Sequence, residues 1–181
     1  MKKGISIIML LFFCNLLFCQ ESQAETEYKA ETKLLINYIL KNFLSASYLN
    51  VQKIATLVKI ENCKEKYESP IFDKSELDYI KQSIKNPKVI YWNQDYFPNL
   101  KIIEKENTQA IYKEGTDDYN KFGKAFDGSI AEFSSPIFLR NYEIVLIRFS
   151  ETSGKLSGIG YEGIFIKKGN NWEIDACSWD N

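Results

Sequence analysis

The chain has 181 residues, of which 45% are hydrophobic and 14% aromatic, and its formal net charge is −1. This composition is ample for one hydrophobic core, which excludes an intrinsically disordered chain. The near-neutral charge excludes the basic surface on which nucleic-acid binding depends, so we expect no nucleic-acid partner.

An export signal is predicted at the start of the chain. Two lysines follow the initial methionine, and the apolar run over 5–18 is too short to cross a bilayer comfortably. Ser22 and Ala24 provide the small residues that a signal peptidase reads before its cleavage position. We therefore expect a signal peptide over 1–24 that is removed by cleavage after Ala24.

Two other processing routes stay open. The chain could be cut before Gln20, or Cys19 could carry a lipid anchor, although a lipid-attachment box normally has a small residue where Phe18 stands. On each route the mature chain has no transmembrane span and lies in the periplasm or outside the cell. Its organisation is expected to be a single α+β domain over 25–181.

The first half of the mature chain is predicted to be mainly helical. Leu35, Ile39 and Phe43 follow one another at intervals of four and form part of a broad apolar helix face. A capping box of Ser75 and Asp78 is expected to begin a second helix. The expected elements are, in chain order, a helix over 25–47, a strand or helix over 51–60, a helix over 75–86, strands over 89–92 and 101–103, a helical turn over 107–113 and a helix from Thr116.

The second half is predicted to form a sheet. Strands are expected over 130–133, 143–150, 160–168 and 172–178, because β-branched and aromatic residues are frequent there. Gly169-Asn170-Asn171 supplies a tight turn between the last two strands. Since helices precede strands, the fold class is α+β, with N-terminal helices packed on a C-terminal antiparallel β-meander.

Three motifs in the second half are similar to those of known proteins. They are Phe133-Ser134-Ser135-Pro136-Ile137-Phe138, which has the pattern Phe-Ser-x-Pro-(Ile/Val)-Phe; Ser153 to Gly160, which follows Cys-Gly-Gly-Leu-Cys-Gly-x-Gly; and the strand to Trp172, which ends like Lys-x-x-Gly-Lys-Trp. On these motifs the chain resembles a family of uncharacterised secreted bacterial proteins. The resemblance implies a shared fold and export, but no activity. Ser153 and Ser157 replace the family's two loop cysteines, so this loop lacks their option of a disulfide or a metal.

The small residues of these motifs have structural interpretations. Gly154, Gly158 and Gly160 are expected to adopt positive φ in a wide hairpin connection. The functional alternative is a phosphate-binding loop, but no helix start or suitably placed lysine follows the glycines. Ser134 and Ser135 precede a proline and are interpreted as turn residues.

The sequence offers few residues for catalysis. It contains no histidine, which most serine, cysteine and metal-dependent hydrolases use as base or ligand. Asp117 with Asp118 and Asp175 with Asp180 are candidate acid pairs for a glycosidase. Structural interpretations are favoured: a helix start explains the first pair, Asp175 alternates outward on its strand, and Asp180 lies one residue from the chain end. We therefore expect no catalytic residue, no metal and no cofactor.

Two other groups of residues are candidate sites. The segment from Tyr91 to Pro98 mixes aromatic, amide and acidic side chains, which is typical of a sugar-stacking or protein-binding surface and equally of a strand edge in a core. The candidate binding residues are Tyr91, Trp92, Tyr96 and Phe97. Cys63 and Cys177, which remain after processing, are a candidate disulfide, with two separate thiols as the alternative.

These observations favour a secreted or envelope-associated binding protein without enzymatic activity, whose partner is a protein, a peptide or a glycan. The alternatives are a small secreted hydrolase that uses carboxylates and an inhibitor or toxin-neutralising protein. A pocket with two close acids beside exposed aromatics would favour the hydrolase, whereas an acid-poor surface with an exposed apolar patch would favour binding.

Overall fold

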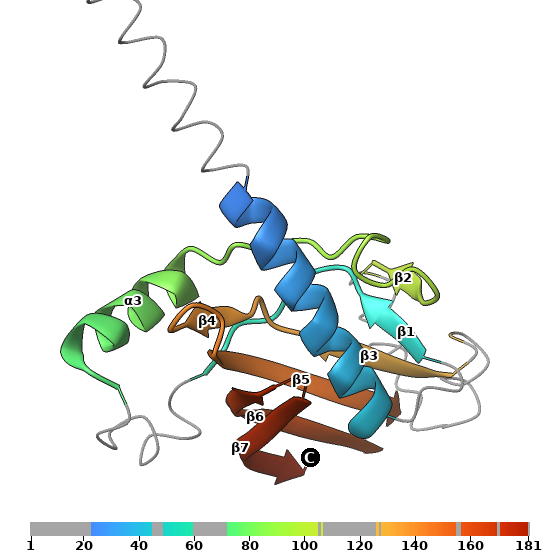
Figure 1. The fold of residues 1–181 in the computed structure, drawn as a ribbon. Helices are drawn as coiled ribbons and strands as arrows, with labels where there is room; N and C mark the ends of the chain where they lie inside the picture. The colour runs from blue at the N-terminus through green and yellow to red at the C-terminus, as the bar shows by residue number, and fades with distance from the viewer. Residues whose placement is uncertain are drawn as a thin grey trace, which may run out of the picture.

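The computed structural model describes residues 23–44, 49–59, 72–104, 106, 126, 128–154, 157–169 and 171–180, with the backbone alone at 154, 157 and 175–180. These residues form an α+β fold of two helices and a seven-stranded mixed sheet (Figure 1). The helices are 23–42 and α3 (Lys74–Lys85). The strands are β1 (Leu49–Gln52), β2 (Lys101–Ile103), β3 (Ser129–Phe133), β4 (Ile137–Leu139), β5 (Ile144–Gly154), β6 (Ser157–Lys168) and β7 (Asn171–Asp180).

The sheet mixes parallel and antiparallel strands. Its order is β2-β1-β3-β5-β6-β7, and β4 pairs with a second stretch of β5. The strands from β3 onward pair antiparallel, whereas β1 pairs in parallel with both β2 and β3. The predicted C-terminal meander is therefore only part of the sheet, because β1 from the first half of the chain is inserted between β2 and β3.

Most of the predicted strands are confirmed. Those over 101–103, 130–133, 143–150, 160–168 and 172–178 correspond to β2, β3, β5, β6 and β7, and the ambiguous segment 51–60 begins within β1. The strand predicted over 89–92 is wrong, because Tyr91 forms only a single bridge with Ile54. The predicted helical turn over 107–113 and the start of the helix at Thr116 lie outside the described residues.

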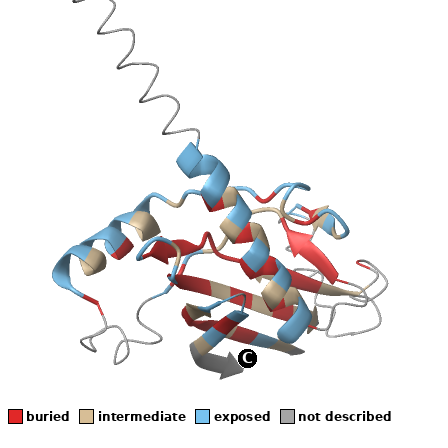
Figure 2. Cartoon of the chain, viewed as in Figure 1, coloured by how far each residue is buried: buried red, intermediate tan, exposed pale blue. Residues whose placement is uncertain are grey.

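Helix 23–42 crosses one face of the sheet (Figure 1). It confirms the helix predicted over 25–47 except at its end, because residue 43 already forms a turn and residue 44 a bend. Leu35, Ile36 and Ile39 are fully buried in a core that includes aromatic side chains of the sheet (Figure 2). Burial of each of these side chains contributes roughly 1.5–3 kcal/mol. The apolar helix face is therefore one of the main sources of stability.

A β-bulge separates β3 from β4. The flanking register pairs are Phe133 with Phe149 and Ile137 with Leu146. Three residues, 134–136, therefore oppose two on β5, and the extra residue shifts the alternation of side chains. Phe133 and Phe138 enter the same core for this reason. The Ser134 hydroxyl accepts the Arg148 N–H at 2.9 Å, so the serines are bulge residues and not the turn residues that were expected.

Helix α3 packs against a second apolar cluster, formed by side chains of β4, β5 and β6, where Ile80 is fully buried. The helix begins with a capping box of Asp73 and Glu76. The Asp73 carboxylate accepts the Glu76 N–H at 2.9 Å, and the Glu76 carboxylate accepts the Asp73 N–H at 3.1 Å. The box predicted at Ser75 and Asp78 is therefore wrong by two residues, because two overlapping pairs have the same spacing.

The hairpin between β6 and β7 has the tight turn that was predicted. Lys168 pairs with Asn171 across it. Gly169 adopts a φ of +60°, in which a larger residue would be strained.

The wide connection predicted between β5 and β6 is wrong. β5 continues to Gly154 and β6 begins at Ser157, so both strands extend through the glycine-rich segment. Gly154, Gly158 and Gly160 do not have the positive φ that was expected of them. Gly158 instead permits close packing, since a Cβ there would lie 3.0 Å from the backbone oxygen of Glu151.

The turn from β4 to β5 contains three consecutive residues in the left-handed region. Arg140, Asn141 and Tyr142 have φ angles of 50°, 53° and 68°, a conformation that costs about 1–2 kcal/mol for each non-glycine residue. Arg140 donates two hydrogen bonds to the Glu76 carboxylate, at 2.8 and 3.0 Å. The Tyr142 ring packs on that of Phe138 with centroids 5.1 Å apart. These contacts offset part of the backbone strain.

Candidate functional site

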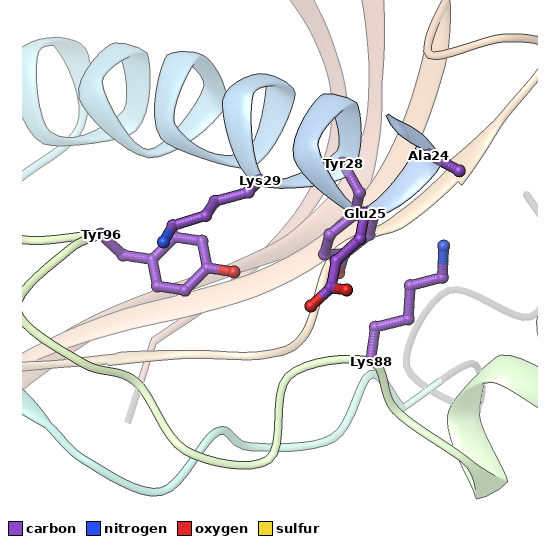
Figure 3. Close-up of a pocket in the computed structure, with 6 residues that line it drawn as sticks. All are labelled: Ala24, Glu25, Tyr28, Lys29, Lys88 and Tyr96. Carbon is purple, nitrogen blue, oxygen red and sulfur yellow. The ribbon is translucent and has the colours of Figure 1, made fainter. Parts of the chain in front are cut away.

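A pocket of about 360 Å³ opens between the first turns of helix 23–42 and the segment 88–96 (Figure 3). The lining residues are Ala24, Glu25, Tyr28, Lys29, Lys88 and Tyr96. Figure 3 shows Lys88 and Tyr96 facing the helix from the segment, with the Glu25 carboxylate pointing into the space between them. The pocket combines two ammonium groups, one carboxylate and two tyrosine rings.

Tyr28 forms the fixed part of the pocket wall. Its ring is buried edge-on against Phe138 with centroids 5.5 Å apart, and its hydroxyl donates to the Pro136 carbonyl at 2.9 Å. The Ser135 hydroxyl lies 3.3 Å from the Tyr28 hydroxyl and accepts the Val89 N–H at 3.0 Å. Ser135 in the bulge therefore contacts both walls of the pocket, Tyr28 on the helix and Val89 on the segment. Burial raises the pKa of Tyr28 well above its usual range, so its hydroxyl stays neutral.

Lys88 extends over this wall. Its ammonium nitrogen lies 4.5 Å from the centroid of the Tyr28 ring, within the range of a cation–π interaction. Lys88 is exposed, and in the part of the chain that the structure describes its ammonium has no carboxylate partner. The Lys88 ammonium and the Tyr28 ring together form one wall of the pocket.

Lys29 completes the opposite side of the pocket. Its ammonium pairs with the Asp95 carboxylate at 2.5 Å and lies 5.9 Å from the centroid of the Tyr96 ring. This hydrogen bond raises the pKa of Lys29 and lowers that of Asp95, while burial raises the pKa of Tyr96. The charged groups are exposed to solvent, so the pair adds little to stability. Its effect is to hold the Lys29 ammonium beside the tyrosine ring.

A second, polar hollow of about 210 Å³ lies on the sheet. Its lining residues are Glu132, Arg148, Ser150, Glu151, Thr152, Gly158 and Ile159. Glu132 on β3 lies opposite Ser150 on β5, and Arg148 lies opposite Glu162 on β6, so these side chains share one face of the sheet. Arg148 Nη1 is 3.6 Å from Glu162 Oε2, and the Glu162 side chain is fully buried. The hollow thus gathers acidic and hydroxyl groups around one arginine.

The structure separates the four aromatic residues that were candidate binding residues. Trp92 and Phe97 are each 1% exposed and lie in the core, where the Trp92 indole donates to the Phe133 carbonyl at 3.1 Å. Tyr91 is 60% exposed, and Tyr96 lines the pocket. Only Tyr91 and Tyr96 therefore present a surface to a ligand in this conformation.

Other candidate residues are not placed. Asp117, Asp118, Cys63 and the side chains of Asp175, Cys177, Asp180 and Ser157 lie outside the described residues. The disulfide and the acid pairs stay predictions. Ser153 is placed, and its hydroxyl lies 2.9 Å from that of Ser129.

Two further observations concern the described ranges alone. In them no three or more His, Cys, Asp or Glu side chains gather in a way that could hold a metal ion. No helix within those ranges is long and apolar enough to cross a membrane.

The sequence did not indicate Tyr28, Lys29 or Lys88 as site residues. Tyr28 precedes Ile36 and Ile39 on the buried helix face, so its pattern indicates core packing. Lys88 follows a helix end and is indistinguishable from other surface lysines. A single sequence contains no pattern that would show that residues 28–29 and residue 88 lie close together in the fold.

Neither family models nor curated proteins nor solved structures match this chain. The resemblance to secreted bacterial proteins therefore rests on the three motifs alone and stays a prediction. The pocket geometry carries the functional argument.

Proposed function

We propose that the protein is an exported, non-enzymatic binding protein that holds a carboxylate of a peptide or protein partner in the pocket between helix 23–42 and segment 88–96. The observation that carries this proposal is the position of two ammonium groups, those of Lys29 and Lys88, over tyrosine rings. Ammonium groups form charge-assisted hydrogen bonds with a carboxylate, and the rings offer apolar surface to the neighbouring atoms of the ligand.

Lys88 is the main anchor of this site. The Lys29 ammonium already forms an ion pair with the Asp95 carboxylate. Lys88 has the Tyr28 ring as its neighbour, and among the described residues no carboxylate neutralises it. A ligand carboxylate therefore interacts more strongly with the Lys88 ammonium than with the Lys29 ammonium.

The surface beside the pocket favours a peptide over a glycan. Ile90 and Tyr91 follow Lys88 along the chain and are 56% and 60% exposed. An exposed isoleucine contacts an apolar side chain well but offers no hydrogen bond to a sugar hydroxyl. Tyr91, a candidate binding residue on sequence grounds, extends the site in this proposal.

Export supports a binding role outside the cytoplasm. The N-terminal lysines, the apolar run and the small residues at Ser22 and Ala24 have the form of a removable signal. The family that the C-terminal motifs resemble is secreted. We place the processed protein in the periplasm or outside the cell, with lipid anchoring at Cys19 as the alternative.

Titration with N-acetyl-phenylalanine, followed by backbone amide NMR, tests the site. Its amide, N-acetyl-phenylalaninamide, lacks only the charge and is the ligand control. We expect the acid to shift pocket resonances, and Lys88→Gln to weaken binding about fivefold, which corresponds to about 1 kcal/mol. Lys41→Gln, at an exposed position of helix 23–42 outside the pocket lining, is the control. Equal shifts from acid and amide, or an unaffected Lys88→Gln variant, would contradict the proposal.

A carboxylate-dependent hydrolase is the second candidate, favoured by the polar hollow on the sheet. Glu132 and Glu162 lie on one face with β5 between their strands. Two strand spacings across the sheet and a two-residue offset along it separate them by about 12 Å, which is more than the distances used by inverting glycosidases. The full burial of Glu162 disfavours this role. Release of nitrophenol from nitrophenyl glycosides that is lost in Glu132→Gln would favour the hydrolase over binding.

A further inference from the structure

We infer that removal of the export signal adds a positive charge to the pocket and thereby strengthens its binding of a carboxylate. Ala24 and Glu25, between which cleavage is expected, both line the pocket (Figure 3). The cleavage position comes from the small residues of the sequence, whereas the pocket comes from the geometry of the fold, so the coincidence joins two independent observations. The inference rests on the proposed function and adds its regulation: the processed protein binds a carboxylate more tightly than the precursor.

The covalent step is hydrolysis of the amide bond between Ala24 and Glu25, with water as the co-reactant and a signal peptidase as the catalyst. The C–N bond breaks, and the oxygen of water bonds to the Ala24 carbonyl carbon, which leaves with the signal peptide as a carboxylate. The Glu25 nitrogen takes up both protons of the water and becomes an α-ammonium. An α-amino group ordinarily has a pKa of about 7.7–8.0, so most of it is charged at pH 7.

Cleavage changes the balance of charge in the pocket. Before it, the two ammonium groups of Lys29 and Lys88 and the two carboxylates of Glu25 and Asp95 together carry no net charge, although only Lys29 and Asp95 are directly paired among the described residues. After it, the α-ammonium of Glu25 offsets the carboxylate of the same residue. The processed pocket therefore carries one more positive charge, and a ligand carboxylate is attracted more strongly to this form than to the precursor.

Glu25 is close enough for its charge to matter. The hydrogen bond to Asp95 is the main cause of the raised pKa of Lys29, and the Glu25 carboxylate adds to it. The same carboxylate adds to the effect of burial on the pKa of Tyr96. Because the backbone nitrogen of Glu25 lies within the same residue, a charge on it acts on the same groups.

The inference also predicts a dependence on pH. The α-ammonium loses its proton near pH 8, while the Asp95 hydrogen bond keeps Lys29 charged. The charged and titratable groups near the pocket are Glu25, Tyr28, Lys29 and Lys33 from the helix and Lys88, Asp95 and Tyr96 from the segment. Affinity for a carboxylate should therefore fall between pH 7 and pH 9 in the processed protein alone.

The experiment compares two forms of the chain 25–181, one with a free Glu25 amine and one with that amine acetylated. Both retain every described element except residues 23 and 24 of the first helix, and near-ultraviolet circular dichroism checks that both are folded. With N-acetyl-phenylalanine as the probe, we expect acetylation to weaken binding about fivefold and to abolish the pH dependence. Glu25→Gln with a free amine removes one negative charge and should tighten binding.

The outcomes separate this inference from the proposed function. If Lys88→Gln weakens binding but acetylation and Glu25→Gln have no effect, the inference is overturned and the binding site stands. If no form binds the probe, the proposed function fails. Amino-terminal sequencing of exported protein must find Glu25 first, and a lipid on Cys19 would overturn the inference.

Discussion

Replacement of Ser135 by alanine tests the junction that holds the two pocket walls together. The Ser135 hydroxyl accepts the N–H of Val89 at 3.0 Å and lies 3.3 Å from the Tyr28 hydroxyl. Val89 is buried, so the substitution leaves a backbone donor without its partner, at a cost of about 1–3 kcal/mol. Tyr28→Phe keeps the ring and removes one hydrogen bond, at a cost of about 1 kcal/mol. Because the two hydroxyls are in contact, the double variant should lose less than the sum of the two single losses.

Urea unfolding, followed by tryptophan fluorescence to which the buried Trp92 and Trp172 contribute, measures these free energies. Ser83→Ala on α3 is a suitable control, because Ser83 has no such hydrogen bond in the described chain, and it should change stability by less than about 0.5 kcal/mol. If Ser135→Ala costs no more than this control, the hydroxyl does not satisfy the buried N–H and the reasoning is refuted. Strict additivity of the Ser135 and Tyr28 substitutions would show that the two hydroxyls are not coupled.

Three further predictions concern stability. Asn141→Gly should stabilise the protein by about 1 kcal/mol, because glycine relieves the strain at φ 53°, whereas Asn141→Ala should not; thermal melting compares the two. Gly158→Ala should destabilise by about 1–3 kcal/mol in urea unfolding, because its Cβ would lie 3.0 Å from the Glu151 backbone oxygen; an unchanged midpoint would show that the strands adjust. The Arg140 hydrogen bonds lower the pKa of Glu76 from its ordinary 4.5, so their stabilisation is present above that pH and is lost as the pH falls below it. Glu76→Gln should lose this part of the pH dependence, and a wild-type profile in the variant would contradict the assignment.

Elements with local patterns could be predicted from the sequence. Leu35, Ile39 and Phe43 repeat at helical spacing within a short stretch, and this spacing alone identifies the buried side of helix 23–42. The β6–β7 hairpin was predictable for the same reason, since Gly169 provides the positive φ of its turn. Each of these features depends on residues that are close together in the chain.

Features that depend on distant residues were missed. Val51 on β1 pairs with Ile102 on β2 and Ala131 on β3. No local sequence pattern predicts such a parallel pairing. The bulge at 134–136 was missed because it consists of one extra residue relative to β5, and that count exists only once the two strands are aligned.

The candidate site was predicted only in part for a similar reason. The composition of the segment from Tyr91 to Phe97 indicates either a core or a binding surface, and packing decides between them for each residue. Trp92 turns inward to donate to a β3 carbonyl, while its neighbour Tyr91 remains exposed. Composition alone therefore identified the segment but not which two of its four aromatic residues are accessible to a ligand.

The structure shows which substitutions can separate binding from folding. Tyr28 lines the pocket and also belongs to the core, so its loss weakens both and cannot identify a binding role. Lys88 and Glu25 both line the pocket but are exposed, so the proposed acetylation of the Glu25 amine changes one exposed group. Changes at these two groups should leave the free energy of unfolding almost unaltered. A loss of carboxylate binding in Lys88→Gln or in the acetylated protein, at unchanged stability, would therefore come from the pocket itself.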